Sequence, residues 1–304
     1  MPIFNIQGSK LLPIKEKDID LEKSIQKLTE ENLETVFSLE FVTSEFALNG
    51  FRIDTLAFDK EANAFVVIEY KRDRGFSVID QGFTYLGQMF NNKAKFILEY
   101  NKKFGTNITQ EEEIDWSQSR VLFLAQSFTT FQQNAMSFKD LPIELWEVQM
   151  YDNSTVLYNQ LISADAKESI KTISDDPIIK SVSKEVRVYT VEDHLNATTD
   201  KVRDLFSALR ERILALGDGI EERPKKMYIS YRTQNAFVYM HMQQSQIKVH
   251  LIIHKSKLED PKDIARDVSK VGHYGGGVTE ILFDKIEDLS YIVTLIEQSY
   301  NAAK

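Results

Sequence analysis

The sequence of 304 residues contains no cysteine. This absence excludes disulfide bonds, thiolate nucleophiles and cysteine-ligated zinc sites, and it fits a reducing compartment. Long apolar runs are also missing, and no basic segment followed by an apolar core stands at the N-terminus. A membrane span and a secretory signal each need such a run, so we expect a soluble, cytoplasmic protein.

A surplus of basic residues is missing as well. Lysine and arginine number 37 against 46 aspartates and glutamates, which gives a formal net charge of −9. Because neutralising phosphates requires clustered basic side chains, this charge argues against generic nucleic-acid binding. A carboxylate-based metal site would itself add acids, however, and a basic strip at Lys71, Arg72 and Arg74 is compatible with an acidic remainder.

Histidines are few, and all five lie after residue 190. His250 and His254 could share one face of a strand, but neither cysteine nor an acid at ligand spacing accompanies them, so we expect no metal site there. The glycine-rich loop 272–277 precedes a strand and lacks the lysine of a phosphate-binding loop. We therefore interpret it as a tight connection that glycine permits.

The most informative stretch holds two apolar runs, 51–58 and 64–71, separated by a polar, turn-prone segment. Runs rich in Phe, Val and Ile on either side of such a segment predict a β-hairpin. Because side chains alternate along a strand, Glu69 and Lys71 should point to the same side. Asp54 lies on the neighbouring strand, near enough for its carboxylate to share a cation with Glu69.

An acid and a lysine at the end of an apolar strand are costly unless they are paired or used. The carboxylates of Asp54 and Glu69, the backbone carbonyl of Tyr70 and water form an all-oxygen set of the kind that Mg²⁺ or Mn²⁺ prefers. Lys71 would then orient or help deprotonate an attacking water, or stabilise charge in the transition state. The plainer interpretation is a hairpin with a surface ion pair.

The order Asp54, fourteen intervening residues, then Glu69-Tyr70-Lys71 resembles the PD-(D/E)XK nuclease superfamily, especially its RecB-like and mismatch-endonuclease-like branches. Ile53 stands where the family motif has proline, a replacement common in these branches. The resemblance implies a restriction-endonuclease-like α/β core, in which a mixed sheet is flanked by helices, and metal-dependent hydrolysis of phosphodiester bonds.

Two further positions match those branches. The resemblance implies that Glu22, in the first predicted helix, completes the metal site, and that Gln81 contacts the metal-bound water or the substrate phosphate with support from Tyr85. Each has a plainer interpretation. Glu22 could be a solvated first-turn acid favoured by the helix dipole, and the other two could form the polar edge of a packed helix.

Length and composition favour two domains, each long enough to bury a core. We predict the nuclease-like domain over residues 1–160, a polar linker over 161–190 that could include one short helix, and a smaller α+β domain with an antiparallel sheet over 191–304. The last segment resembles an uncharacterised small α+β domain often found C-terminal to such nuclease folds.

Local patterns predict three helices whose limits the structure can test. Asp18 or Asp20 can cap a helix that runs to about Phe37. Thr190–Leu216 has the apolar periodicity of one long amphipathic helix, and another helix is expected near Pro261–Val271.

These patterns together predict a Mg²⁺- or Mn²⁺-dependent nuclease acting on DNA, with Glu22, Asp54 and Glu69 as metal ligands and the C-terminal domain serving recognition, regulation or dimerisation. A homodimer is one arrangement, since many enzymes that cut both strands act as pairs. A second hypothesis is a non-catalytic scaffold that keeps the fold and binds a nucleic acid, ligand or partner. A third makes the C-terminal domain a small-molecule sensor that gates the nuclease. The strand tyrosines Tyr228, Tyr231 and Tyr239 could form a sheet that stacks on RNA bases, but aromatic residues on strands mostly serve packing.

Overall fold

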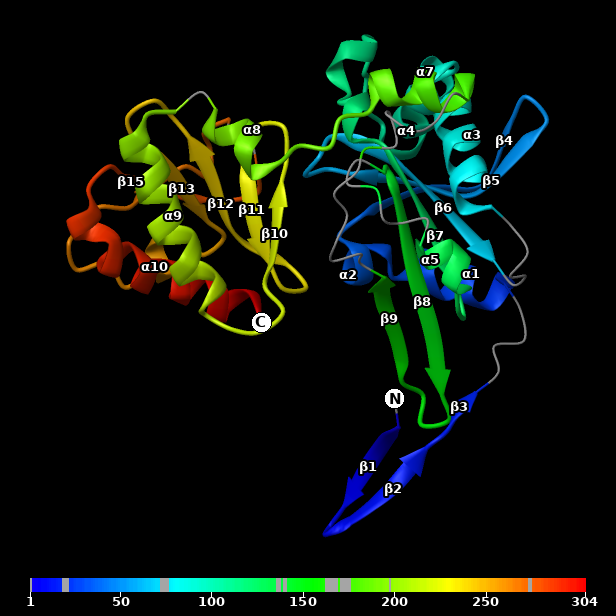
Figure 1. Ribbon diagram of the computed structural model, residues 1–304, viewed down its shortest axis with the longest axis horizontal. Coiled ribbons are helices and arrows are strands. Elements are labelled where there is room, and N and C mark those ends of the chain that lie inside the picture. Colours follow the sequence, from blue (N-terminus) through cyan, green and yellow to red (C-terminus); the bar gives the residue numbers. More distant parts are fainter. Residues whose placement is uncertain are drawn as a thin grey trace. The chain divides into compact units, whose positions relative to one another are not determined.

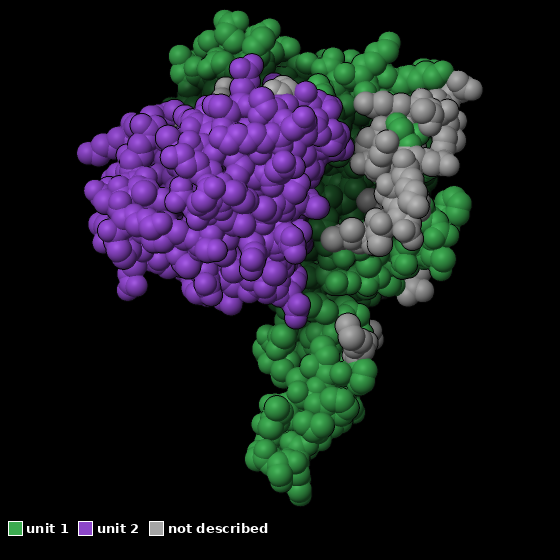
Figure 2. Space-filling view, turned by 60° about the vertical axis from the view of Figure 1, so that its left-hand side comes forward, with its two compact units in different colours: residues 1–188 green, residues 189–304 purple. Residues whose placement is uncertain are grey.

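The computed structural model describes residues 2–17, 22–71, 77–134, 138, 141–161, 169, 176–196, 198–272 and 275–304, and the side chain of Glu22 lies outside this set. Glu22, Arg72 and Arg74 are thus predicted site residues whose side chains the structure does not describe. The chain divides into two compact units, residues 1–188 and 189–304, which Figure 2 colours separately.

Unit 1 is built on a mixed β-sheet (Figure 1). Its described strands are β3 (Glu16–Lys17), β4 (Glu40–Leu48), β5 (Phe51–Asp59), β6 (Ala64–Lys71), β7 (Arg120–Ala125), β8 (Ile143–Tyr151) and β9 (Val156–Leu161). They follow the order β3-β8-β7-β6-β5-β4, and β9 also pairs with β8. The central strands β6, β7 and β8 are parallel, whereas β4, β5 and β9 run antiparallel to their neighbours.

The predicted β-hairpin is confirmed as β5 and β6, which pair from Thr55–Ile68 to Asp59–Ala64. Asn63, in the turn between them, has a left-handed φ of 52°, a conformation that asparagine tolerates better than most residues. The preceding turn at Asn49-Gly50 has φ values of 48° and 85°, the pair of positive angles that a tight hairpin turn requires. Local turn chemistry therefore sets the order β4-β5-β6.

Helices cover both faces of this sheet (Figure 1). The described helices of unit 1 are α1 (Glu22–Glu31), α2 (Leu33–Phe37), α3 (Val78–Phe90), α4 (Lys93–Phe104), α5 (Thr130–Asn134) and α7 (Pro177–Glu185), with short 3₁₀ turns at Glu111–Glu113 and Trp116–Gln118. Val66 and Ile68 enter the core shared with α1 and α2, while Phe65 and Val67 enter the core beneath α3 and α4. Strand β6 is thus buried on both faces, as its unbroken apolar run predicts.

The first helix differs from the expectation of one helix running to Phe37. It ends at Glu31, and α2 begins at Leu33 after a break at Asn32, whose side-chain amide donates to the carbonyl of Leu28 at 2.8 Å. An asparagine that bonds its own backbone competes with helix continuation, which explains the break.

The segment 161–190, expected to be a linker, is partly built into unit 1. Helix α7 begins at Pro177 with Asp176 as its N-cap, and its Ile179 and Val182 are buried in the core beneath α3. The boundary between the units lies after Val188. The short helix allowed for in this segment is α7.

Unit 2 is an α+β unit with an antiparallel sheet, as predicted. Its described strands are β10 (Glu221–Pro224), β11 (Ile229–Arg232), β12 (Ala236–Met242), β13 (Ile247–Leu251), β14 (Arg266–Asp267) and β15 (Thr279–Phe283), in the order β10-β11-β12-β13-β15-β14. Its described helices are α8 (Val191–Leu195), α9 (Asp200–Leu214) and α10 (Leu289–Ala303), with 3₁₀ turns at Lys255–Lys257 and Ile286–Asp288. Apolar side chains of α9 and α10 form one core with the sheet.

Two helix predictions in unit 2 are wrong. The expected helix over Thr190–Leu216 is divided into α8 and α9, because Thr199 caps a new helix by accepting from the backbone N–H of Val202. No helix forms among the described residues near Pro261–Val271. There the Asp260 carboxylate accepts the backbone N–H of Ala265 at 2.8 Å and holds a loop that leads into β14.

A separate hairpin, β1 (Ile3–Gln7) and β2 (Lys10–Ile14), precedes the main sheet of unit 1. None of the described helices combines the length and the apolar character needed to cross a membrane.

Candidate functional site

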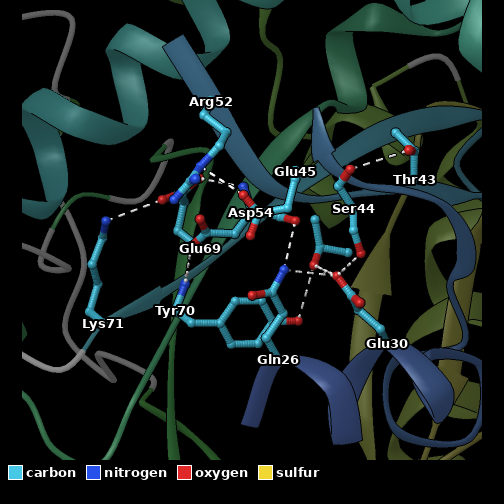
Figure 3. Close-up of polar contacts among 11 residues, drawn as sticks. Gln26, Glu30, Thr43, Ser44, Glu45, Arg52, Asp54, Glu69, Tyr70 and Lys71 are labelled. Atoms are coloured by element: carbon cyan, nitrogen blue, oxygen red, sulfur yellow. Dashed lines mark hydrogen bonds and ion pairs between the residues drawn. The ribbon is translucent and has the colours of Figure 1, made fainter. Parts of the chain in front are cut away.

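The β5–β6 ladder ends where the predicted acids begin. Its last backbone pair is Thr55–Ile68, and beyond it side chains replace the ladder bonds. The Asp54 carboxylate accepts the backbone N–H of Tyr70 at 3.1 Å, and the Glu69 carboxylate accepts the backbone N–H of Asp54 at 3.2 Å (Figure 3). These two bonds bring the carboxyl groups of Asp54 and Glu69 together where the backbone pairing of β5 and β6 ends.

Lys71 adds the nearby positive charge. Its ammonium donates to the second oxygen of Glu69 at 3.1 Å, and the side chains of Lys71 and Glu69 are only 20% and 2% exposed. The alternative of a hairpin with a surface ion pair is therefore wrong, because the pair is largely buried. Buried charge of this kind is costly and calls for compensation.

The electrostatics show that one lysine does not compensate two acids. The pKa of Glu69 is raised to about 7, first by burial and then by the negative charge of Asp54, while Lys71 opposes both effects. Burial also raises the pKa of Asp54, against the bond from the Tyr70 N–H and the charge of Lys71. The pair therefore favours a bound proton or another cation.

The Tyr70 carbonyl is the predicted third oxygen ligand. The N–H and C=O of one strand residue face the same neighbouring strand, and the Tyr70 N–H faces Asp54. Its carbonyl therefore lies on the side of the carboxylates. The described residues contain no group of three or more His, Cys, Asp or Glu side chains placed to hold a metal. A cation here would need the carbonyl, water or a ligand outside the described side chains, such as Glu22.

Helix α3 brings Tyr85 to the same place. Burial raises the pKa of the Tyr85 phenol, and so does its interaction with the Glu69 carboxylate. Gln81 lies one helical turn earlier, on the same face of α3. Its Oε1 atom is buried and has no hydrogen-bond partner within the described residues, so an acceptor is left open on this face of α3.

Sequence reasoning missed a network beneath the carboxylates (Figure 3). The Gln26 amide donates to the backbone carbonyl of Asp54 at 3.0 Å and to the Glu30 carboxylate at 3.1 Å. Glu30 also accepts from the hydroxyls of Thr55 at 2.5 Å and Ser44 at 2.6 Å. The network ties α1 to the backbone at Asp54. Its signal was the four-residue spacing of Glu22, Gln26 and Glu30 along one helical face.

A third acid that the sequence analysis did not identify, Glu45, lies next to Asp54 on the neighbouring strand β4. The register of β4 and β5 places Glu45 opposite Asp54, and its charge contributes to raising the pKa of Asp54. Arg52 pairs with Glu45 at 2.8 Å and opposes that effect. Glu45 has a φ of 51°, unusual for a non-glycine strand residue, which marks a local irregularity in β4 beside the carboxylates.

The described tyrosines in and beside β11 and β12 of unit 2 offer no exposed stacking surface. Tyr228, Tyr231 and Tyr239 are 3%, 0% and 6% exposed, and Tyr228 packs edge-on against Tyr239. The interpretation of these side chains as packing is confirmed, and that of a base-stacking sheet is wrong. His250 is buried against Glu280 at 3.1 Å within the same sheet.

Comparison with known proteins shows a relative that matches nearly the whole chain. It is 40% identical over 300 residues to an uncharacterized protein of Haemophilus influenzae, a match that covers 98% of this chain and 99% of that protein. Residues 191–303 match a family described as a domain of unknown function, DUF5655, in agreement with the predicted likeness of the C-terminal segment to an uncharacterised domain.

Two solved structures are also similar in part. A repair endonuclease from Pyrococcus abyssi matches at 19% identity and an EndoMS–dsDNA complex at 17%, each with a TM-score of 0.25. The matches cover 44% and 45% of this chain and 50% of each of those chains, so this chain corresponds to about half of either. A TM-score of this size does not establish a common fold.

Proposed function

The chain belongs to the same family as the uncharacterized Haemophilus influenzae protein, and from its β5–β6 hairpin we propose that unit 1 is a PD-(D/E)XK-type nuclease. It would have a restriction-endonuclease-like core and hydrolyse phosphodiester bonds of DNA with Mg²⁺ or Mn²⁺. The observation that carries the proposal is the pair formed by the buried Glu69 and the partly buried Asp54. Each carboxylate accepts a backbone N–H where the strand pairing ends, and the pKa of Glu69 is raised despite Lys71.

The chemistry of the donors fits a hard divalent cation. Carboxylate and carbonyl oxygens suit Mg²⁺ and Mn²⁺, and Asp54, Glu69 and the Tyr70 carbonyl supply them at one place. The open Oε1 of Gln81 adds an acceptor suited to a metal-bound water. In the proposal Glu22 completes the set from the start of α1.

When bound, the cation would supply a polarised water and offset the negative charge of the scissile phosphate. The residues of the chain have separate tasks. Asp54 and Glu69 would hold the cation, and their bonds to backbone N–H groups fix their orientation. The Lys71 ammonium, anchored by Glu69 at 3.1 Å, would orient the attacking water or stabilise charge on the phosphate. The Gln81 Oε1 atom would accept a hydrogen bond from that water, and Tyr85 lies on the same face of α3.

The test is cleavage of labelled circular, linear and single-stranded DNA, and of RNA, with Mg²⁺, Mn²⁺ or EDTA. Asp54→Asn and Lys71→Met are each expected to lower the metal-dependent rate by about 100-fold or more. Lys60→Met is the matched control, because Lys60 is an exposed lysine of the same hairpin paired with Glu40 at 2.6 Å. It should cut at the wild-type rate.

The non-catalytic scaffold gives a different set of results. If wild-type protein gains thermal stability with Mn²⁺ but cuts no substrate, the site binds a cation without nuclease activity. If neither cleavage nor metal-induced stabilisation occurs, or if Lys60→Met and Lys71→Met cut equally well, the proposed roles are refuted.

A further inference from the structure

The β1–β2 hairpin, termed here the arm, exposes an apolar face. Its strands pair antiparallel through a two-residue turn at Gly8 and Ser9. Directly opposed residues share a face, so the pairs Phe4–Pro13 and Ile6–Leu11 lie together on one side. Phe4, Ile6 and Leu11 are 44%, 72% and 61% exposed.

Only the base of the arm is fixed to unit 1. Strand β3 pairs with β8 through Glu16–Tyr151 and Lys17–Met150. In addition, the Lys15 carbonyl accepts the backbone N–H of Asp152 at 3.0 Å, and the Lys15 N–H donates to the Asp152 carboxylate at 3.3 Å. Above that point, β1 and β2 pair with each other and with no other strand of the described chain (Figure 1). A lone two-stranded hairpin is marginal in water, so its apolar face should be covered by another surface.

We propose that this face packs against the same face of a second copy of the chain, related by a two-fold axis. The charge distribution favours this occupant. Residues 1–15 contain Lys10 and Lys15 but no acid, so the acid surplus of a chain with net charge −9 lies entirely outside the arm. Two acidic chains approach with least repulsion where neither carries a carboxylate.

The contact face itself carries no charge. Lys10 lies opposite Gln7 on the other side of the hairpin, together with Asn5 and Leu12. A two-fold axis can therefore bring Phe4, Ile6, Leu11 and Pro13 of both arms together without opposing like charges. A nucleic acid is a poorer occupant, because two lysines beside an uncharged apolar face provide little phosphate neutralisation.

The size of the arm limits the affinity. Two strands of five residues each offer less than the roughly 800 Å² per partner of a standard interface. A dimer through the arms should therefore dissociate on dilution.

The test is sedimentation or light scattering of the full chain over a range of concentrations, without metal or DNA, so that its outcome is independent of the nuclease proposal. The double variant Ile6→Glu/Leu11→Lys places an opposite-charge pair across the hairpin, which keeps the strands paired while removing the apolar face. Asn5→Glu/Leu12→Lys places the same pair on the other face and is the matched control.

We expect a concentration-dependent dimer for the wild type and the control, and a monomer for Ile6→Glu/Leu11→Lys with unchanged thermal unfolding. Because the chain lacks cysteine, Ile6→Cys gives a second measurement. It should form an oxidised dimer readily, and Asn5→Cys should not. A monomeric wild type at every concentration, or equal dimerisation of both double variants, would overturn the proposal.

Discussion

Two clusters of one cation and two carboxylates lie at opposite ends of the hairpin that carries the site. At the turn end, Arg120 bonds Asp59 at 2.9 Å and Glu144 at 2.8 Å. At the other end, Lys71 bonds Glu69 at 3.1 Å, while the Asp54 carboxylate accepts a backbone N–H. The formal charge is the same in both clusters, but their electrostatic states differ.

The difference follows from the shape of the cation. A guanidinium presents donors in several fixed directions and can serve two carboxylates at once, whereas an ammonium is a compact charge. Burial lowers the pKa of Arg120, but Asp59 and Glu144 outweigh it and raise that pKa overall. At Glu69, burial and Asp54 outweigh the lysine and raise the pKa of the acid. The first cluster is complete in itself, and the second has capacity for a further cation.

Replacing each cation by methionine should separate the two clusters most strongly. Arg120→Met removes the cation from the buried Asp59 and the partly buried Glu144 and should cost about 3–5 kcal/mol of unfolding free energy. Lys71→Met at pH 6 should cost on the order of 1 kcal/mol, because Glu69 can retain a proton there. Urea denaturation without metal measures both. Equal losses would mean that the clusters are equivalent.

The pH dependence of stability is the second way to sharpen the comparison. The folded pKa of Glu69, about 7, exceeds its ordinary value of 4.5, so the native state holds more protons between those pH values. Metal-free stability should therefore fall as pH rises through this window, by on the order of 2 kcal/mol from this group.

Added Mg²⁺ should have the opposite dependence, because it binds the deprotonated acids. The apparent affinity for Mg²⁺ should fall about tenfold for each pH unit below 7, and the stabilisation by Mg²⁺ should fall with it. Asp54→Asn keeps an oxygen for the Tyr70 N–H but removes a charge, so it should flatten the metal-free decline and abolish the response to Mg²⁺. Thermal unfolding from pH 4.5 to 8 measures these effects. A metal response that grows as the pH falls would contradict this assignment.

The smallest expected effect concerns the support beneath Asp54. Gln26→Ala removes the bonds to the Asp54 carbonyl and to Glu30 and should cost about 1 kcal/mol, with a weaker Mn²⁺-induced rise in unfolding temperature. Glu31→Ala is the control on the same helix, since its pair with Lys27 is exposed and 3.9 Å long. If both variants respond equally to Mn²⁺, Gln26 has no positioning role.

The hairpin and the two-sided burial of β6 could be predicted because both depend on local patterns. An unbroken apolar run ending in Glu69 and Lys71 is visible in the sequence, and so are the turns before and after β5. The helix limits were harder. Asn32 and Thr199 can stand inside a helix or interrupt one, and a side-chain bond to the backbone decides between these outcomes.

The supporting network could not be predicted, because it depends on how α1 docks against the sheet. Gln26 and Glu30 are ordinary surface residues by type, and only contact with Asp54, Thr55 and Ser44 gives them a role. Periodicity located one face of the helix but not its partner. Long-range packing supplies that information.

The complete burial of β6 limits which sequence changes the protein can tolerate. Every residue from Ala64 to Tyr70 is buried, so apart from Lys71 at its end this strand has no position at which a substitution leaves the core untouched. Glu69 belongs to that strand, whereas Asp54, on β5, is only partly buried. Substitutions that change the chemistry of the site without destabilising the fold are therefore expected on β5 and α3. A variant with altered specificity would be sought on these two elements and not on β6.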